Sequence, residues 1–149
     1  IYKDGPNEVS AAARTNLRSA GFHLHVGYEN RNIDTSMVML QYIDAYVGIP
    51  SIIYDTDAER RKLYGKAGCF RLTKYGFEYR TLSSYWIGSP KRLQFIWNQL
   101  MRALNAFEER CILPDCSLVR DAINNNDIQT ANVLIETYKL IDPNNVIPD

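Results

Sequence analysis

Alternating apolar and polar residues predict a strand at residues 21–28, near the start of the chain. The apolar positions 22, 24 and 26 fall on one face, while His23, His25 and Gly27 fall on the other. His23 and His25 are the only histidines in the sequence. Two imidazoles on one face of a strand commonly bind one metal ion, and such a pair is also found where both rings are satisfied by hydrogen bonds. The pattern leaves both interpretations open.

A second alternating pattern predicts a hairpin at residues 69–83, with its turn at residues 74–76, where a glycine supplies the turn geometry. Because side chains alternate across a strand, Arg71, Glu78 and Arg80 are expected to meet on one face of the sheet. One interpretation is the ordinary solvated face of an antiparallel sheet. The other is a catalytic floor that binds anions through the arginines and a metal ion or an amine through the glutamate.

Helical spacing of apolar residues follows this first strand. We predict a helix that begins with Asp34 as its N-cap and ends at Gly48. Pro50 prevents its continuation, so residues 51–54 are expected to be extended.

A short basic helix is predicted at residues 55–64, and it includes Arg60 and Arg61. It leads into a turn in which glycines at positions 65 and 68 flank Lys66. Glycine lets backbone amides approach a ligand closely, which suits a phosphate group. The spacing matches neither a Walker A loop nor a dinucleotide-binding fingerprint, so a plain turn is the alternative interpretation.

The second half of the chain is predicted to be helical. A long helix begins with Ser89 as N-cap and Pro90 at its first position, and it ends near residue 111. Apolar residues at spacings of three and four predict its core-facing stripe, which is Leu93, Ile96, Trp97, Leu100, Leu104 and Phe107. Two shorter helices are predicted to follow, at residues 117–125 and 127–141.

Together these elements predict an α+β fold with an antiparallel sheet and a C-terminal helical segment. We expect a single domain over residues 1–149, with a sheet-rich region at 18–88 and a helical region at 89–141. The chain starts at Ile1 rather than methionine, which predicts that an N-terminal segment is missing.

Charge and cysteine content limit the classes of partner. The 17 basic and 17 acidic residues give a formal net charge of zero, so no electrostatic case exists for nucleic acid or an anionic membrane. No apolar run approaches the roughly 18 residues that a membrane span needs. Three cysteines, Cys69, Cys111 and Cys116, cannot all pair with one another, which predicts free thiols and a reducing compartment.

Several motifs, taken in order along the chain, carry a family resemblance. They are His23-Leu24-His25-Val26-Gly27-Tyr28, Ile43-Asp44, Val47-Gly48-Ile49-Pro50, Arg60-Arg61, Tyr64-Gly65-Lys66-Ala67-Gly68, Phe70-Arg71, Tyr75-Gly76, Glu78-Tyr79-Arg80-Thr81-Leu82-Ser83 and Trp86. This set resembles the phage-encoded amidoligases, the second type of carboxylate–amine ligase, which are distantly related to glutamine synthetase and glutamate–cysteine ligase. The resemblance covers residues 18–86 and extends more loosely to residue 107.

The resemblance implies an ATP-dependent ligase in which the antiparallel sheet forms a ligand-binding floor, here for ATP, and helices pack on its other face. In such enzymes ATP phosphorylates a carboxylate, and an amine then displaces phosphate from the acyl phosphate to form an amide. Arginines and Mg²⁺ or Mn²⁺ neutralise the transferring phosphoryl group. The implied residues are Arg80, Glu78 and Arg71 for catalysis, His25 and Glu78 for the metal, and Lys66, Arg60, Arg61 and His23 for the nucleotide.

The implied partners are carboxylate and amine substrates, peptides or proteins among them, in the cytoplasm of a bacterial host. A homo-oligomer or assembly into a phage particle, and thus a place in the virion, also fits. One departure concerns the metal: related ligases carry acidic ligands on a strand before the histidine strand, whereas only Asp4 and Glu8 precede His23 here. A missing segment or another chain supplies those ligands, or the protein is a non-catalytic phage structural or decoration protein with a ligase-like fold.

Overall fold

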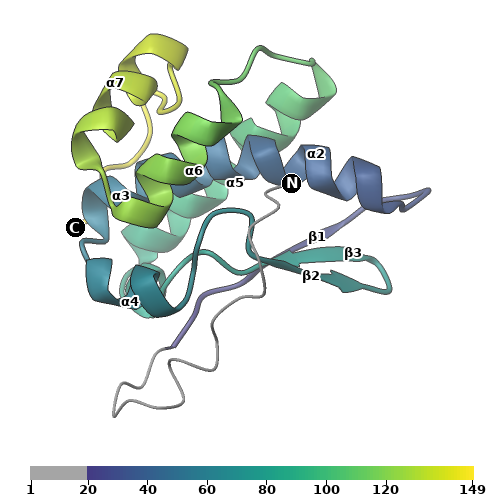
Figure 1. The fold of residues 1–149 in the computed structure, drawn as a ribbon, viewed down its shortest axis with the longest axis horizontal. Helices are drawn as coiled ribbons and strands as arrows, with labels where there is room; N and C mark the ends of the chain where they lie inside the picture. The colour runs from purple at the N-terminus through teal and green to yellow at the C-terminus, as the bar shows by residue number, and fades with distance from the viewer. Residues whose placement is uncertain (1–19) are drawn as a thin grey trace.

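The computed structural model describes residues 20–149. Figure 1 shows the sheet along one side of the molecule and the helices stacked on the other. The expectations that concern Asp4, Glu8 and an early strand fall outside the described residues.

The sheet has three antiparallel strands in the order β1-β3-β2. They are β1 (Leu24–Gly27), β2 (Phe70–Thr73) and β3 (Gly76–Tyr79). The predicted strand and hairpin are thus confirmed, although each strand is shorter than its alternating pattern. Gly76 has a φ of +154°, and a Cβ there would lie 2.1 Å from the carbonyl oxygen of Val26. Glycine therefore allows β1 and β3 to approach at the hairpin turn.

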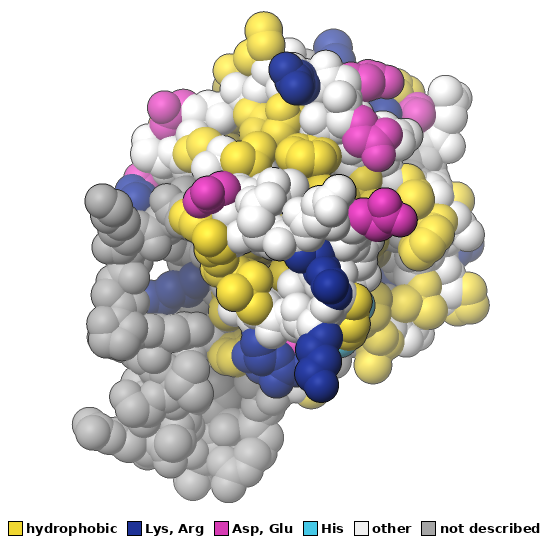
Figure 2. Space-filling model, turned by 90° about the vertical axis from the view of Figure 1, so that its right-hand side faces the viewer, with side chains coloured by type: hydrophobic (Ala, Val, Ile, Leu, Met, Phe, Trp, Pro, Cys, Tyr) yellow, Lys and Arg dark blue, Asp and Glu magenta, His cyan; other side chains and the backbone are white. Residues whose placement is uncertain are grey.

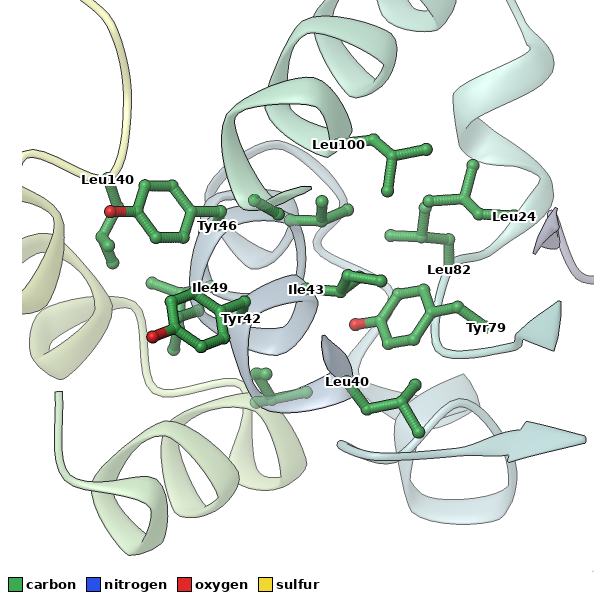
Figure 3. Packing of buried hydrophobic residues seen from close by; sticks show 14 of the residues in the cluster. Leu24, Leu40, Tyr42, Ile43, Tyr46, Ile49, Tyr79, Leu82, Leu100 and Leu140 are labelled. Carbon is green, nitrogen blue, oxygen red and sulfur yellow. The ribbon is translucent and has the colours of Figure 1, made fainter. Parts of the chain in front are cut away.

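The two faces of the sheet differ as the alternation predicted. Four apolar side chains of β1 and β3 are buried against the helices, namely Leu24, Val26, Phe77 and Tyr79. Figure 3 shows the Tyr79 ring pointing toward Ile43 and Leu40 of the adjacent helix. On the opposite face, the strand register places His25 beside Glu78 and Glu78 beside Arg71. The three polar residues form one row across the sheet.

One long helical segment forms the centre of the helical layer. It consists of α2 (Ile33–Ile43), a π-helical turn (Asp44–Gly48) and α3 (Ile49–Tyr54). The predicted helix end at Gly48 and the predicted extended segment at 51–54 are therefore wrong. Gly48 has the helical angles φ −61° and ψ −52°, and Pro50 lies in the first turn of α3, where a proline is tolerated.

The start of this segment also differs from the prediction. Asn32 is the N-cap, and its side chain accepts a 2.7 Å hydrogen bond from the backbone N–H of Thr35, whereas Asp34 lies in the first turn. The continuous helix Ile33–Tyr54 is 22 residues long and apolar enough to cross a membrane by length and composition, contrary to the expectation that no segment would be. Because 78% of its apolar window is buried inside the fold, it fits the core helix of a folded domain.

Two further helices flank the sheet region. The basic helix α4 spans Ala58–Leu63, with Asp57 as N-cap, and is shorter than the predicted 55–64. The long helix α5 spans Pro90–Glu108, and Ser89 caps it as predicted.

The buried face of α5 matches the prediction only in part, since Ile96 and Leu100 are buried as predicted. Trp97 is 58% exposed and Leu93 is also exposed, so the prediction that both lie in the core is wrong. The buried face instead includes Phe95 and Gln99. The Gln99 side-chain amide donates hydrogen bonds of 2.5 Å and 2.8 Å to carbonyl groups of the π-helical turn and of the segment after α7. These bonds satisfy the side-chain amide of Gln99 in the core, so a polar residue lies on the buried face of α5.

The remaining elements complete the helical layer. A 3₁₀ turn (Ser84–Ile87) precedes α5, and α6 (Cys116–Asn125) and α7 (Ile128–Tyr138) follow it. The α+β class and the C-terminal helical segment are confirmed. Cys69, Cys111 and Cys116 form no disulfide bond with one another, as predicted. The division into regions 18–88 and 89–141 stays a prediction.

Candidate functional site

Glu78 lies at the centre of the polar face of the sheet. Its Oε1 is 2.6 Å from Nδ1 of His23 and 3.7 Å from Nε of Arg80, and its Oε2 is 2.6 Å from Nη2 of Arg71. The Glu78 side chain is only 2% exposed, whereas Arg71 is 63% exposed and Arg80 is 29% exposed. The predicted meeting of Arg71, Glu78 and Arg80 is confirmed, and His23 joins them. The buried carboxylate thus holds His23 and Arg71 at hydrogen-bonding distance and forms a longer ion pair with Arg80.

The charge of Glu78 is stabilised by these neighbours. Burial acts to raise the pKa of the carboxyl group, but the hydrogen bond and charge of Arg71, together with His23 and Arg80, hold the pKa below its usual value. Glu78 is therefore ionised at neutral pH. Because both oxygens already face donors, its main role in this arrangement is to orient His23 and Arg71.

His23 is neutral in this environment. Burial lowers the pKa of its imidazole and Arg80 acts in the same direction, which together outweigh the opposing effect of Glu78. Facing a carboxylate, Nδ1 carries the proton and donates it to Glu78 in a hydrogen bond. Nε2 then keeps its lone pair. This atom is buried and has no hydrogen-bond partner within residues 20–149.

His25 occupies the next position on the same face but has a different partner. It lies directly across from Glu78 in the strand register and is exposed. Its Nδ1 forms a short hydrogen bond with the hydroxyl group of Tyr75 at the hairpin turn. The two rings lie 5.9 Å apart between centroids. The prediction that both histidines share one face is confirmed, whereas a metal role for His25 stays a prediction.

Arg80 is held mainly by stacking. Its guanidinium carbon lies 5.7 Å from the centroid of the Tyr64 ring. Its Nε is buried, and no acceptor within the described part of the chain bonds it; Glu78 Oε1, at 3.7 Å, is beyond hydrogen-bond distance. Within residues 20–149, Nε of Arg80 therefore has no acceptor at hydrogen-bond distance, which suits a residue that binds an anion.

The glycine-flanked turn that contains Lys66 is tied to the end of β3. The Thr81 hydroxyl donates a 2.9 Å hydrogen bond to the carbonyl oxygen of Lys66, and the backbone N–H of Arg80 donates a 2.8 Å bond to the carbonyl oxygen of Cys69. Gly65 has a φ of +81°, and a Cβ there would lie 2.6 Å from the carbonyl oxygen of Thr81. These contacts bring the turn beside Arg80. Phosphate binding by Lys66 stays a prediction.

Arg60 and Arg61 are both buried, at 3% and 1% exposure. The Arg60 guanidinium donates bonds of 3.0 Å and 2.8 Å to the carbonyl oxygens of Thr81 and Leu82. Arg61 donates through Nε to the Asn126 side chain at 3.1 Å. Burial lowers the pKa of both groups, although Asp55 partly offsets it. The structure thus gives both arginines contacts within the protein, and their predicted role in nucleotide binding stays a prediction.

Basic side chains gather at the hairpin end of the molecule. Figure 2 shows Lys and Arg side chains in the lower half of this face, where the sheet lies, and Asp and Glu side chains above them. Within residues 20–149 no group of three or more His, Cys, Asp or Glu side chains is close enough to hold a metal ion. Arg71 and Arg80 give the sheet face guanidinium groups, which are donors that commonly bind anions in proteins.

Sequence patterns did not single out every residue that shapes this site. The local pattern places Tyr64 at the end of a helix and Tyr75 in a turn. In the structure, Tyr64 contacts Arg80 and Tyr75 contacts His25. An aromatic residue beside a glycine-rich turn was the available signal for Tyr64. No local pattern shows which distant side chain an aromatic ring will meet.

This polar face belongs to an α+β domain whose sheet carries His23, Arg71 and Arg80 around the buried Glu78. The chain matches the phage phiEco32-like COOH.NH2 ligase-type 2 family over residues 9–113, and it belongs to that family. The match spans most of the chain and extends beyond both ends of the resemblance read from the motifs. No curated protein and no solved structure shows a significant match. The predicted family is confirmed, and the relation to glutamine synthetase stays a prediction.

Proposed function

We propose that this domain joins a carboxylate to an amine at the polar face of the sheet, in an ATP-dependent reaction that passes through an acyl phosphate. Membership of a phage carboxylate–amine ligase family carries the proposal as far as the two substrates. The observation that supports the nucleotide is the arrangement of Arg71 and Arg80 around the buried Glu78. When bound, ATP supplies the phosphoryl group that activates the carboxylate.

Each residue of the face has a part in this proposal. Arg80 binds the transferring phosphoryl group or the acidic substrate, because its Nε has no acceptor at hydrogen-bond distance within residues 20–149. Arg71 is exposed and adds a second positive charge. Lys66 lies on the turn beside Arg80 and is the candidate for a nucleotide phosphate. Glu78 orients His23 and Arg71 through its two oxygens.

A divalent metal ion fits this face only in part. Mg²⁺ prefers oxygen ligands and commonly keeps several waters while it binds phosphates. The described residues offer Glu78, whose oxygens already face donors, and the lone pairs of His23 and His25. In the proposal, phosphate and water therefore supply most of the ligands of Mg²⁺ or Mn²⁺. His25 supplies at most one ligand atom.

The proposed setting is the cytoplasm of the bacterial host of the phage, which agrees with three free cysteines. Peptide or protein substrates and a homo-oligomer remain compatible with the proposal. The family match does not favour the alternative, a non-catalytic structural or decoration protein.

Thermal unfolding with and without Mg·ATP tests the proposal. At about 100 times the dissociation constant, the nucleotide should stabilise the protein by roughly 2.7 kcal/mol, a shift of several degrees. The shift should fall in Arg80→Ala and in His25→Ala. Arg120→Ala is the matched control, because Arg120 is 30% exposed and ion-paired like Arg80 but lies on α6. An absent shift in the wild-type protein would remove ATP from the proposal.

A further inference from the structure

Tyr64 is the residue through which Arg80 is connected to the helical layer. Two guanidinium groups lie over its ring: that of Arg60, at 5.3 Å from the centroid, and that of Arg80, at 5.7 Å. Both distances are within the range of cation–π attraction. The two arginines come from α4 and from the end of β3, so one ring contacts both elements.

Arg60 supports the Tyr64 ring through contacts within the protein. Its guanidinium bonds the carbonyl oxygens of Thr81 and Leu82, the two residues that follow Arg80. The backbone N–H of Tyr64 in turn bonds the carbonyl oxygen of Arg60 at 2.7 Å. Because Arg60 is buried and bonded on both sides, it provides a rigid support for the ring.

Apart from its contact with the Tyr64 ring, the Arg80 side chain forms a long ion pair with Glu78. Its Nε has no hydrogen-bond partner within the described residues, and its distance to Glu78 is 3.7 Å. A flexible arginine loses side-chain entropy when it binds a ligand. A ring that restricts it beforehand reduces that loss without occupying its donors.

We propose that Tyr64 is a positioning residue: its ring, supported by Arg60, holds the Arg80 guanidinium in place to receive an anionic group. This inference rests on the proposed function for the identity of the anion, but the contact itself does not. The hydroxyl group of Tyr64 has no part in it, so phenylalanine should replace tyrosine at this position.

The motion of the Arg80 side chain tests the contact directly. In ¹⁵N-labelled protein the Nε–H signal of Arg80 is identified by its loss in Arg80→Lys. Its order parameter should be high in the wild type and in Tyr64→Phe, and it should fall in Tyr64→Leu. Tyr85→Leu is the matched control, because it removes the ring that lies 3.8 Å from Arg92 and should leave the Arg80 signal unchanged.

Affinity for Mg·ATP provides the second measurement. Tyr64→Leu should weaken binding between about twofold and fivefold, the range that an exposed cation–π contact supports. In the Arg80→Ala background the same change should have no further effect. An equal loss in both backgrounds would show that Tyr64 acts independently of Arg80 and would overturn the proposal.

The two failures are distinguishable. If the wild-type protein binds no Mg·ATP, the proposed function fails, while the Arg80 signal still decides the role of Tyr64. An order parameter that is the same in Tyr64→Leu and in the wild type overturns the positioning role at any affinity. If Tyr64→Leu does not fold, Tyr64→Met, whose unbranched and flexible side chain also lacks the ring, takes its place. A nuclear Overhauser effect between the Tyr64 ring and the Arg80 Cδ protons is expected in the wild type, and its absence would also overturn the contact.

Discussion

The Tyr79 hydroxyl group donates a 2.7 Å hydrogen bond to Oδ1 of Asp44, and both side chains are completely buried. This bond joins β3 to the π-helical turn of the central helical segment. Tyr79 lies between Glu78 and Arg80 in the sequence, so the bond fixes from behind the strand that carries the polar face.

Removal of this hydroxyl should therefore destabilise the fold. In Tyr79→Phe a buried carboxylate oxygen loses its donor, and we expect the free energy of unfolding to fall by about 1–3 kcal/mol. Urea denaturation measures the change. Tyr42→Phe is the control, since its hydroxyl bonds the Cys111 carbonyl oxygen in a part-buried position and should cost less. An equal loss in the two variants would contradict a special cost at Asp44.

Truncation of two aromatic residues of α5 should lower the free energy of unfolding by very different amounts. Phe95 is 1% exposed and stacks on Trp86 at 5.7 Å, so Phe95→Ala should cost roughly 3–5 kcal/mol. Trp97→Ala should cost less than about 1 kcal/mol, because a residue 58% exposed leaves no cavity. Chemical denaturation compares the two. A larger loss of stability in Trp97→Ala than in Phe95→Ala would support the sequence-based prediction that Trp97 lies in the core.

Acid should weaken the protein through Glu78. Because the folded state holds the Glu78 pKa below that of the unfolded chain, the unfolded chain binds more protons as the pH falls. The stabilising contribution is complete above the unfolded pKa and is lost as the pH falls through the folded pKa. Glu78→Gln removes this contribution, so the wild type should exceed the variant in stability near pH 7 and lose that advantage as the pH falls below the ordinary pKa of a glutamate.

Urea midpoints of both proteins at several pH values measure this difference. His23 acts in the same direction, since burial lowers the pKa of its imidazole and protonation at low pH opposes folding. Asp127→Asn is a useful control, because the Asp127 pKa is also lowered but the residue caps α7 far from the sheet. A stability gap between wild type and Glu78→Gln that does not change with pH would contradict the assignment to Glu78.

Arg80 should be required for the reaction but not for the fold. In Arg80→Ala we expect kcat/KM for ADP formation, assayed with a panel of carboxylates and amines, to fall by roughly 10²-fold or more. The melting temperature should change little, because Arg80 makes few polar contacts within the protein. Arg120→Ala should keep full activity. Normal turnover by folded Arg80→Ala would place the anion site elsewhere.

The local pattern of the sequence determined the polar face. Alternation with a period of two put His23 and His25 on one side of a strand, and it put Arg71, Glu78 and Arg80 on one side of a hairpin. These assignments hold because a pleated strand fixes side-chain direction from neighbouring residues alone. The cap at Ser89 was equally local, since a side chain and a backbone group three residues away decide it.

Tertiary structure decided the rest. Gly48 and Pro50 can end a helix or lie inside one, and here the segment stays helical where α5 packs against the π-helical turn and α6 and α7 pack against α3. The buried face of α5 includes the polar residue Gln99, whose side-chain amide donates hydrogen bonds to carbonyl groups that are distant in the sequence. The contact of Tyr64 with Arg80 likewise joins two separate elements. Such interactions depend on chain segments brought together by folding, and no pattern of neighbouring residues contains them.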